Sequence, residues 1–247
     1  MRTCWALALI GLAACGRLGF DAAGHDEPEP DAASDGALID ASDAASTAPP
    51  AFKRLCAYQA FTVIDDANAV DDAAGMQLAS ATRAGCATMA AITATSQDAA
   101  GVLDPMTNRP LIGPSALGVV GGGSTNQRVI GYLGIADTPL VENTAGSRTR
   151  LIVRATGVTA LDAAPGAYNS THDVGYVQLT LEPISGTWIV AAAGRTETAT
   201  AAIGVWFAAN VTMILASAGT WFIIDWQDND TTVGPSPGDR FTIVSAG

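Results

Sequence analysis

The chain has 247 residues and carries 24 Asp and Glu against 12 Lys and Arg, a formal net charge of −12 at pH 7. This acidic balance argues against nucleic acid or an anionic lipid surface as a partner, because phosphate groups repel it. Hydrophobic residues make up 49% of the chain, which is enough for a sizeable core.

Residues 1–15 have the pattern of an export signal. Arg2 gives a positive start, an apolar run extends from Trp5 to Leu12, and the small residues Ala13 and Ala14 precede Cys15. This order is typical of a secretory signal. The apolar run is far shorter than the ~20 residues of a membrane-spanning helix, so we do not expect a transmembrane anchor.

The sequence Leu12-Ala-Ala-Cys15 resembles the lipobox of bacterial lipoproteins. The resemblance implies that residues 1–14 are a cleaved signal peptide and that Cys15 becomes the first residue and carries acyl chains such as palmitate. Two acyl chains anchor a protein stably, since each buried methylene contributes ~0.8 kcal/mol. Gly16 rather than Asp follows the cysteine, which in this family implies the outer membrane. The alternative is an ordinary cleaved signal that contains a cysteine.

Residues 15–50 are predicted to form a disordered acidic tether behind the lipidated cysteine. The segment is rich in Ala, Asp, Ser and Pro, and it cannot bury enough apolar surface to offset the entropy of ordering. Repulsion between like charges extends such a segment, so we expect a spacer. An acidic Ala- and Asp-rich stretch after Cys-Gly-Arg-Leu-Gly-Phe-Asp resembles lipoproteins of myxobacteria. The acidic residues are Asp21, Asp26, Glu27, Glu29, Asp31, Asp35, Asp40 and Asp43.

Two cysteines remain once Cys4 leaves with the signal and Cys15 is lipidated. Cys56 and Cys86 are predicted to form a disulfide, because exported proteins meet an oxidising compartment. The bond would close a loop of about 30 residues and stabilise the fold by ~3 kcal/mol on the chain-entropy model. A buried free pair and a metal site are the alternatives, and no further ligand lies near either cysteine in the sequence.

Residues 51–247 are predicted to form one globular domain of alternating strands and helices. Aromatic and β-branched residues predict a strand at Tyr58–Ile64, and helix-forming residues predict a helix at Ala69–Ala84. A short apolar strand at Leu117–Val120 is followed by Gly121-Gly-Gly123. Ser124 is then the N-cap of a helix candidate that extends to Leu133.

The second half of the domain adds mainly strands. Strands are predicted at Thr149–Ala155, Gly175–Leu181 and Thr187–Ala193, an apolar helix at Thr196–Val211, and a closing strand pair at Trp221–Trp226 and Arg240–Val244. Strands separated by helices predict an α/β fold. We expect a three-layer, Rossmann-like sandwich with a mixed sheet and an antiparallel C-terminal portion.

Three segments occur in an order that resembles α/β modules of archaeal S-layer and other cell-surface proteins. They are Asn108 to Gly123, Trp188 to Arg195 with the helix that follows, and Trp221 to Asp230. The resemblance covers about Phe52 to Gly247. It implies a structural or interaction domain at a cell surface and not a catalyst.

Oxygen-bearing side chains are densest between the two closing strands, where Asn229 stands among several aspartates. Calcium prefers several carboxylate and carbonyl oxygens on a flexible loop, and extracellular calcium is abundant enough for weak sites. The candidate calcium ligands are Asp225, Asp228, Asp230 and Asp239. The run lacks EF-hand spacing, and a solvated polar turn is the alternative that we favour.

Gly121-Gly-Gly123 lies between a predicted strand and a predicted helix, where backbone N–H groups can hold a phosphate. Asn126 stands where the dinucleotide fingerprint requires its third glycine, and no Walker lysine follows. Close packing of a helix on a sheet explains the glycines equally well. We therefore predict no nucleotide cofactor.

Nucleophilic catalysis has little support in the sequence. No Gly-x-Ser-x-Gly elbow is present, and His172 is the only histidine of the domain. Its neighbours Ser170 to Asp173 share one stretch of chain, so we expect an exposed loop histidine. Glu142, Glu182 and Glu197 are too scattered to indicate a glycosidase pair, and a zinc site is equally unsupported.

Four tryptophans lie in the predicted strands and helix of the domain. Trp188, Trp206 and Trp221 are expected to pack in the core, whereas Trp226, beside the polar turn, is expected to be exposed. An exposed tryptophan can contribute to a platform for sugar or peptide.

These features together predict a lipid-anchored extracytoplasmic protein with a structural or binding role in the envelope. Its expected partners are the membrane, through the anchor, and envelope polysaccharide or other surface proteins. The alternative is a hydrolase of envelope polymers. The position of His172 relative to Asp225, Asp228 and Glu182 discriminates between the two. A contiguous pocket lined by His172 and two acidic residues would favour the enzyme, and a shallow surface without such convergence would favour the binding role.

Overall fold

The computed structural model describes residues 49–65, 69–89, 91–96, 102–121, 138–145, 148–230, 232 and 234–247. The chain divides into two units, Met1–Ser46 and Thr47–Gly247, and every element below belongs to the second. The predicted signal peptide, Cys15 and the tether up to residue 48 lie outside the described residues.

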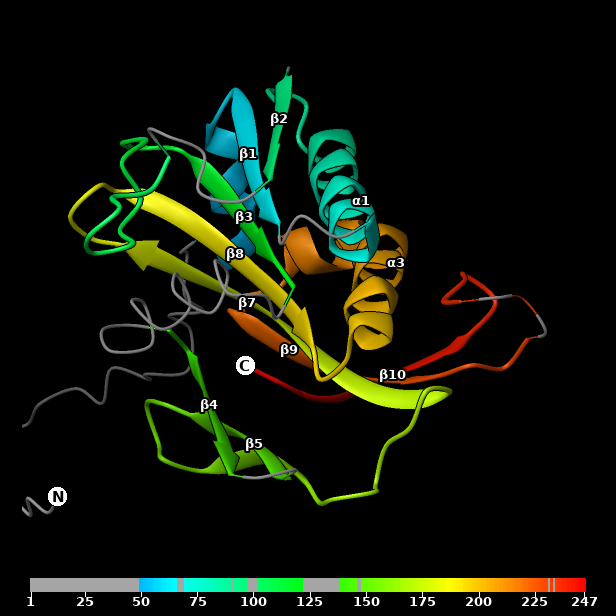
Figure 1. The fold of residues 1–247 in the computed structure, drawn as a ribbon. Helices are drawn as coiled ribbons and strands as arrows, with labels where there is room; N and C mark the ends of the chain where they lie inside the picture. The colour runs from blue at the N-terminus through cyan, green and yellow to red at the C-terminus, as the bar shows by residue number, and fades with distance from the viewer. Residues whose placement is uncertain are drawn as a thin grey trace, which may run out of the picture. The chain divides into compact units, whose positions relative to one another are not determined.

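A seven-stranded mixed sheet forms the centre of the domain, in the order β10-β9-β7-β8-β3-β1-β2 (Figure 1). Its parallel part consists of β1 (Ala60–Asp65), β2 (Ala91–Ser96), β3 (Ala116–Val120) and β8 (Thr187–Gly194). These strands are rich in Ala, Val and Ile, and β3 is buried along its whole length. Burial on both faces is typical of the parallel part of a sheet.

The antiparallel part of the sheet comes from the last third of the chain. It consists of β7 (His172–Glu182), β9 (Trp221–Gln227) and β10 (Arg240–Ala246), each antiparallel to its neighbour. The predicted mixed sheet and its antiparallel C-terminal portion are therefore confirmed. So is the closing pair of strands.

Two long helices lie side by side against one face of the sheet, α1 (Ala69–Gly85) and α3 (Glu197–Ala216) (Figure 1). Their backbones approach closely at Gly204, where a Cβ would lie 2.9 Å from the Cα of Ala74. The side chain of Thr196 caps α3 by accepting from the N–H of Ala199 at 3.2 Å. A 3-10 helix, η1 (Ala51–Ala57), packs beside them.

Within the described part of the chain, α3 is the one helix long and apolar enough to cross a membrane. Its most apolar window has a mean hydropathy of 1.7, and 56% of that window is buried inside the protein. A core helix of a folded domain has these same properties. α3 contributes Ile203, Trp206 and Phe207 to the main core, which explains why it is apolar almost all round.

A second, three-stranded antiparallel sheet packs on the opposite face of the large sheet. Its strands are β4 (Leu140–Ala145), β5 (Arg148–Val153) and β6 (Thr159–Ala163), in that order. One core cluster joins Leu140, Leu151, Leu161 and Ala163 of this sheet to Val174, Tyr176, Ala193, Trp221 and Ile223 of the large one. The N–H of Leu140 also donates to the side-chain oxygen of Gln178 at 2.9 Å.

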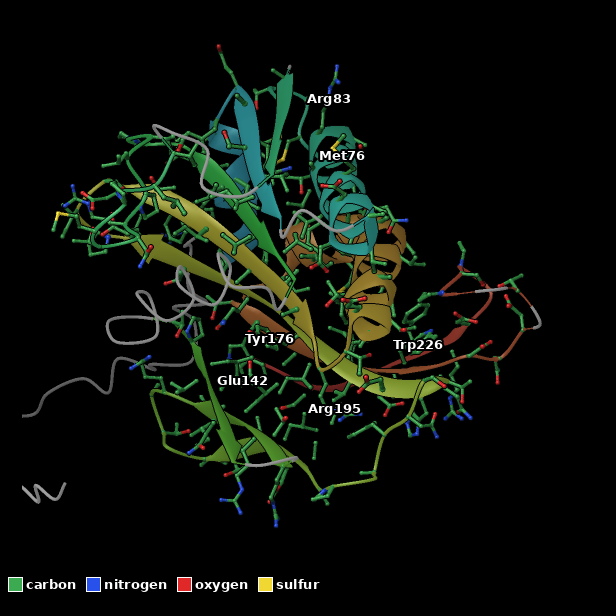
Figure 2. The ribbon with its side chains drawn as sticks, in the orientation of Figure 1. Met76, Arg83, Glu142, Tyr176, Arg195 and Trp226 are labelled. Atoms are coloured by element: carbon green, nitrogen blue, oxygen red, sulfur yellow. A yellow bond between two sulfur atoms is a disulfide. The ribbon has the colours of Figure 1, made fainter. Side chains whose placement is uncertain are left out.

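Strand β7 connects the two cores because alternate side chains of a strand point to opposite faces. Val177 and Leu179 belong to the core on the helix side, and Val174 and Tyr176 to the core between the sheets. Burial raises the pKa of Tyr176, and the carboxylate of Glu142 on β4 raises it further (Figure 2).

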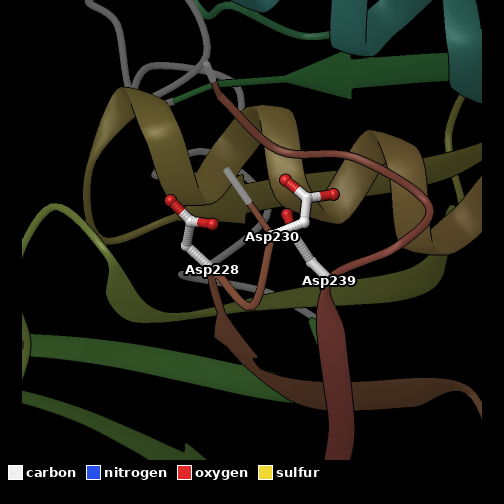
Figure 3. A group of neighbouring side chains, drawn as sticks. All are labelled: Asp228, Asp230 and Asp239. Atoms are coloured by element: carbon white, nitrogen blue, oxygen red, sulfur yellow. The ribbon is translucent and has the colours of Figure 1, made fainter. Parts of the chain in front are cut away.

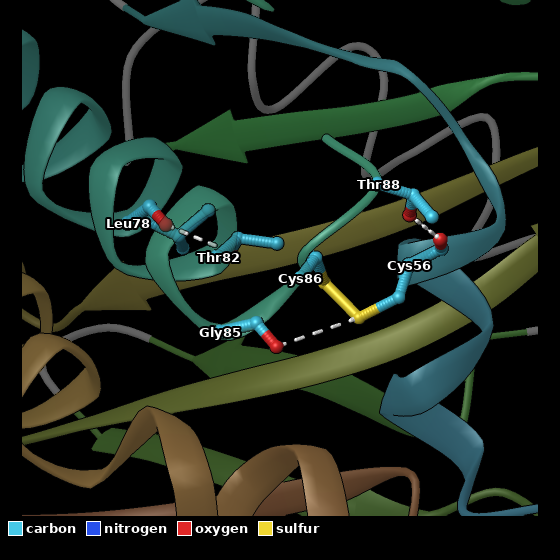
Figure 4. Close-up of a disulfide and its surroundings, with 6 residues drawn as sticks. All are labelled: Cys56, Leu78, Thr82, Gly85, Cys86 and Thr88. Atoms are coloured by element: carbon cyan, nitrogen blue, oxygen red, sulfur yellow. Dashed lines mark hydrogen bonds between the residues drawn. A yellow bond between two sulfur atoms is a disulfide. The ribbon is translucent and has the colours of Figure 1, made fainter. Parts of the chain in front are cut away.

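The disulfide between Cys56 and Cys86 is present in the structure, with the two Cα atoms 4.9 Å apart (Figure 4). It joins η1 to the residue that follows α1, and the hydroxyl of Thr88 donates to the carbonyl of Cys56 beside it. Cys86 is 1% exposed, so the bond is part of the core. The predicted pairing is confirmed.

The α/β class is confirmed, and the described elements differ from the prediction in one layer. Among the described elements, a three-stranded sheet and no helix lies on the second face of the large sheet. The helix predicted from Ser124 to Leu133 lies outside the described residues. The finer prediction, a Rossmann-like three-layer sandwich, therefore stays a prediction.

Candidate functional site

The turn between β9 and β10 brings three of the four predicted metal ligands together. One carboxylate oxygen each from Asp228, Asp230 and Asp239 lies within 4.8 Å of the others (Figure 3). Asp225 does not join this group, because its carboxylate lies 2.8 Å from His172 Nε2. We call Asp228, Asp230 and Asp239 the carboxylate cluster.

Asp239 is the buried member of the carboxylate cluster, with 8% of its surface exposed. It stands directly before β10, and its carboxylate accepts from Trp226 Nε1 at 2.9 Å, from the N–H of Ser236 at 2.9 Å and from that of Asn229 at 3.3 Å. The carboxylate thereby ties both strands and the turn together. Its first role is structural, because it satisfies an indole that would otherwise be buried without a partner.

Asp230 is held by hydroxyl groups of the same turn. Its carboxylate accepts from the N–H of Thr232 at 2.8 Å, and from the hydroxyls of Thr232 and Ser236. These hydrogen bonds, that from Ser236 first, hold the pKa of Asp230 below its usual value. The side chain is therefore ionised at neutral pH.

Asp228 differs from the other two members because one of its oxygens has no partner among the described residues. Its Oδ1 is buried and accepts no hydrogen bond from the part of the chain that the structure describes. Its backbone N–H donates to the carbonyl of Thr171 at 2.8 Å, which fixes its place in the turn. A buried carboxylate oxygen without a partner costs about 1–3 kcal/mol or more. A cation or a water molecule at this position would remove that cost.

The prediction that His172 lies on an exposed loop is wrong. His172 is the first residue of β7, half-buried, with its ring 2.8 Å from Asp225 of β9. The ring of Tyr168 meets the imidazole edge-on, with centroids 5.2 Å apart. Burial raises the pKa of Tyr168, and the nearby carboxylate of Asp225 raises it further.

An ion pair between Asp173 and Arg195 lies beside this histidine. Asp173 is fully buried, and its carboxylate accepts from Arg195 Nε at 3.0 Å and from the hydroxyl of Thr196 at 2.7 Å. The Arg195 guanidinium also lies 5.7 Å from the centre of the Tyr168 ring. These contacts hold the junction between β8 and α3 against β7, so we infer that their role is to stabilise the fold.

Glu182 does not lie near His172, because the two residues are the opposite ends of the 11-residue strand β7. At ~3.3 Å per residue their Cα atoms are separated by roughly 30 Å. Glu182 is buried and accepts from the N–H of Ser185 at 2.6 Å, within the turn that leads to β8. The described residues therefore do not bring His172, Asp228 and Glu182 into one pocket.

The glycine segment after β3 meets a carboxylate where a nucleotide would place its phosphate. Gly121 has a φ of +95°, and a Cβ there would lie 2.2 Å from Oδ2 of Asp71. Asp71 belongs to the first turn of α1 and is 2% exposed. A buried acidic group at this edge disfavours an anion, while Gly122 and Gly123 lie outside the described residues.

The predicted exposure of Trp226 is also wrong. Trp226 is 1% exposed, and Trp221 and Trp206 are 7% and 3% exposed. Trp188 is half-buried, with the guanidinium of Arg54 lying 4.8 Å from its ring centre. The tryptophans therefore act in the core, and the described residues contain no tryptophan platform at the turn.

No protein-family model matches the chain, and no curated protein matches it in sequence. The chemistry of the carboxylate cluster therefore rests on the contacts given above.

Proposed function

We propose that the chain is an extracytoplasmic lipoprotein, anchored in the outer membrane by acyl chains on Cys15, with a structural or binding role. The observation that carries the proposal is the sequence Leu12-Ala-Ala-Cys15 after a short apolar run. The disulfide between Cys56 and Cys86 supports it, because such bonds persist in oxidising compartments. The domain would act in the periplasm or at the cell exterior, in an S-layer-like role toward envelope polysaccharide or other surface proteins.

Metabolic labelling with palmitate tests the anchor in the full chain expressed in a Gram-negative host. The wild type should take up label and fractionate with the outer membrane. Cys15→Ser should abolish both, and the matched variant Cys4→Ser should retain both, because Cys4 leaves with the signal. Cleavage of the signal without acylation would contradict the lipoprotein and support an ordinary exported protein.

We propose calcium as the ligand of the carboxylate cluster, which gives the binding role a chemical basis. Asp228, Asp230 and Asp239 supply hard oxygen ligands on a turn, and the buried Oδ1 of Asp228 has no other partner among the described residues. Repulsion among three close carboxylates also favours a cation between them.

A calcium titration followed by the melting temperature tests this site. Extracellular calcium modules bind with Kd of about 10⁻⁴–10⁻³ M. Calcium at tenfold to hundredfold above Kd should therefore stabilise the folded protein by about 1.4–2.7 kcal/mol. Magnesium serves as the control, since it demands a tighter octahedral site. An unchanged midpoint in calcium would remove the site and leave a self-contained polar turn.

The alternative of a hydrolase has one supporting contact, the pair of His172 with Asp225. A carboxylate that orients a histidine is a part of many catalytic triads. Among the described residues, however, Asp225 is the only side chain hydrogen-bonded to the imidazole, so no nucleophile is hydrogen-bonded to it. The binding role is therefore the better supported of the two.

A further inference from the structure

The segment from Asn169 to His172 forms a closed turn just before β7. The N–H of Asn169 donates to the carbonyl of His172 at 2.7 Å, and the N–H of His172 donates back to Asn169 at 3.3 Å. Asn169, Ser170 and Thr171 are all exposed. The turn thus presents three consecutive side chains to solvent in one fixed backbone shape.

The side chains of this turn are paired in a specific way. Asn169 Oδ1 accepts from the N–H of Thr171 at 2.8 Å and from its hydroxyl at 2.9 Å. The Thr171 hydroxyl therefore lies beside the Asn169 carboxamide, so one enzyme active site can contact both groups. No hydrogen bond among the described residues uses the amide nitrogen Nδ2 of Asn169, so it is free to react.

Asn169-Ser-Thr171 has the Asn-x-Ser/Thr form of an acceptor for N-linked glycans, which is a surface feature of exported proteins. Two further tripeptides have this form, beginning at Asn210 and Asn229. Asn210 is inside α3, and its Nδ2 already donates to the carbonyl of Trp206 at 2.9 Å. The tripeptide at Asn229 ends at residue 231, outside the described residues.

We propose that Asn169 is a glycosylation site of the exported protein, and this rests on the proposed export. The donor is an oligosaccharide carried on a lipid diphosphate. Asn169 Nδ2 bonds to the anomeric carbon, the bond from that carbon to the diphosphate oxygen breaks, and the lipid diphosphate leaves with the electron pair. Nδ2 loses one proton to the base of the transferase, so the step involves no oxidation or reduction.

Glycopeptide mass spectrometry of the full chain, purified from the envelope of the organism that encodes it, tests the proposal. The peptide that contains Asn169 should carry a glycan mass. Asn169→Gln and Thr171→Ala should remove it, whereas Thr171→Ser should retain it, because serine supplies the same hydroxyl. Asn210→Gln is the matched control and should leave the glycan in place.

Acylation of Cys15, measured in the same sample, separates this inference from the proposed function. An acylated chain whose Asn169 peptide is unmodified overturns the glycosylation site and leaves the lipoprotein intact. A glycan found at Asn210 or Asn229 but not at Asn169 also overturns it. Melting temperatures of the variants should match the wild type, which shows that loss of the glycan is not loss of the fold.

Discussion

Two turns of the large sheet each bury a carboxylate, and they satisfy it differently. In the turn between β7 and β8, Glu182 is 1% exposed and accepts from the N–H of Ile184 at 3.2 Å and from the N–H and hydroxyl of Ser185. Donors of its own turn hold this carboxylate. The turn therefore needs nothing from outside the chain.

The turn between β9 and β10 holds more acceptors than the donors of its described residues satisfy. Asp239 is anchored by Trp226, as Glu182 is by its own turn. Asp228 and Asp230 add two further charges nearby, and the buried Oδ1 of Asp228 has no partner among the described residues. A single buried carboxylate with its own donors therefore indicates a structural role. A surplus of clustered acceptors indicates a ligand.

The largest expected effect comes from Glu182, which should matter for folding alone. Glu182→Ala leaves the N–H groups of Ile184 and Ser185 without their acceptor in a partly exposed turn, so we expect a loss of about 2 kcal/mol in the free energy of unfolding. Urea denaturation with and without calcium measures it. The loss should be the same in both, and Glu182→Gln, which keeps one acceptor, should lose less. If the loss in unfolding free energy depended on calcium, Glu182 would not be a purely structural carboxylate and the difference between the two turns would not hold.

Sequence patterns located the elements with strong side-chain signals and missed those without. Strands β7, β8 and β9 and helix α3 are rich in buried apolar residues, and each was predictable. Strands β4 and β6 carry Glu142 and Asp162 and show little apolar alternation. They are held by pairing with β5 and by a few residues at the interface with the large sheet, which no local pattern indicates.

The site residues show the same limit, because their partners are distant in sequence. Trp226 was predicted to be exposed since it precedes a polar turn, but Asp239, 13 residues on, satisfies its indole. His172 pairs with Asp225, which is 53 residues away. Strand alternation could have placed Asp225 on the opposite face from Trp226, whose indole contacts Asp239, because neighbouring side chains on β9 point to opposite faces.

A change of intermediate size, and of opposite sign, is expected at Asp228. Asp228→Asn removes one charge from the carboxylate cluster and is cheaper to bury than a carboxylate. Without calcium the variant should gain about 1 kcal/mol in the free energy of unfolding. With calcium it should lose most of the stabilisation that the wild type shows, because a neutral carboxamide oxygen binds calcium more weakly than a carboxylate.

Asp225→Asn is the matched control for this prediction. Asp225 is on the same hairpin but pairs with His172 outside the carboxylate cluster, so its calcium response should equal that of the wild type. Thermal melts at several calcium concentrations measure both variants. A wild-type calcium response in Asp228→Asn would remove Asp228 from the site.

The smallest effect concerns two partly exposed aspartates whose pKa values are both lowered. Backbone N–H groups of Thr107 and Met106 lower the pKa of Asp104, and hydroxyls of Ser236 and Thr232 lower that of Asp230. A carboxyl group whose pKa is lower in the folded than in the unfolded protein stabilises the fold at pH values above its unfolded pKa, near 3.9. This stabilisation is lost as the pH falls through the folded-state pKa. Carboxyl titration by NMR should therefore place both below that value. Saturating calcium should lower the pKa of Asp230 further and leave that of Asp104 unchanged, since only Asp230 belongs to the carboxylate cluster. If calcium changed the two pKa values equally, the carboxylate cluster would be an ordinary polar turn.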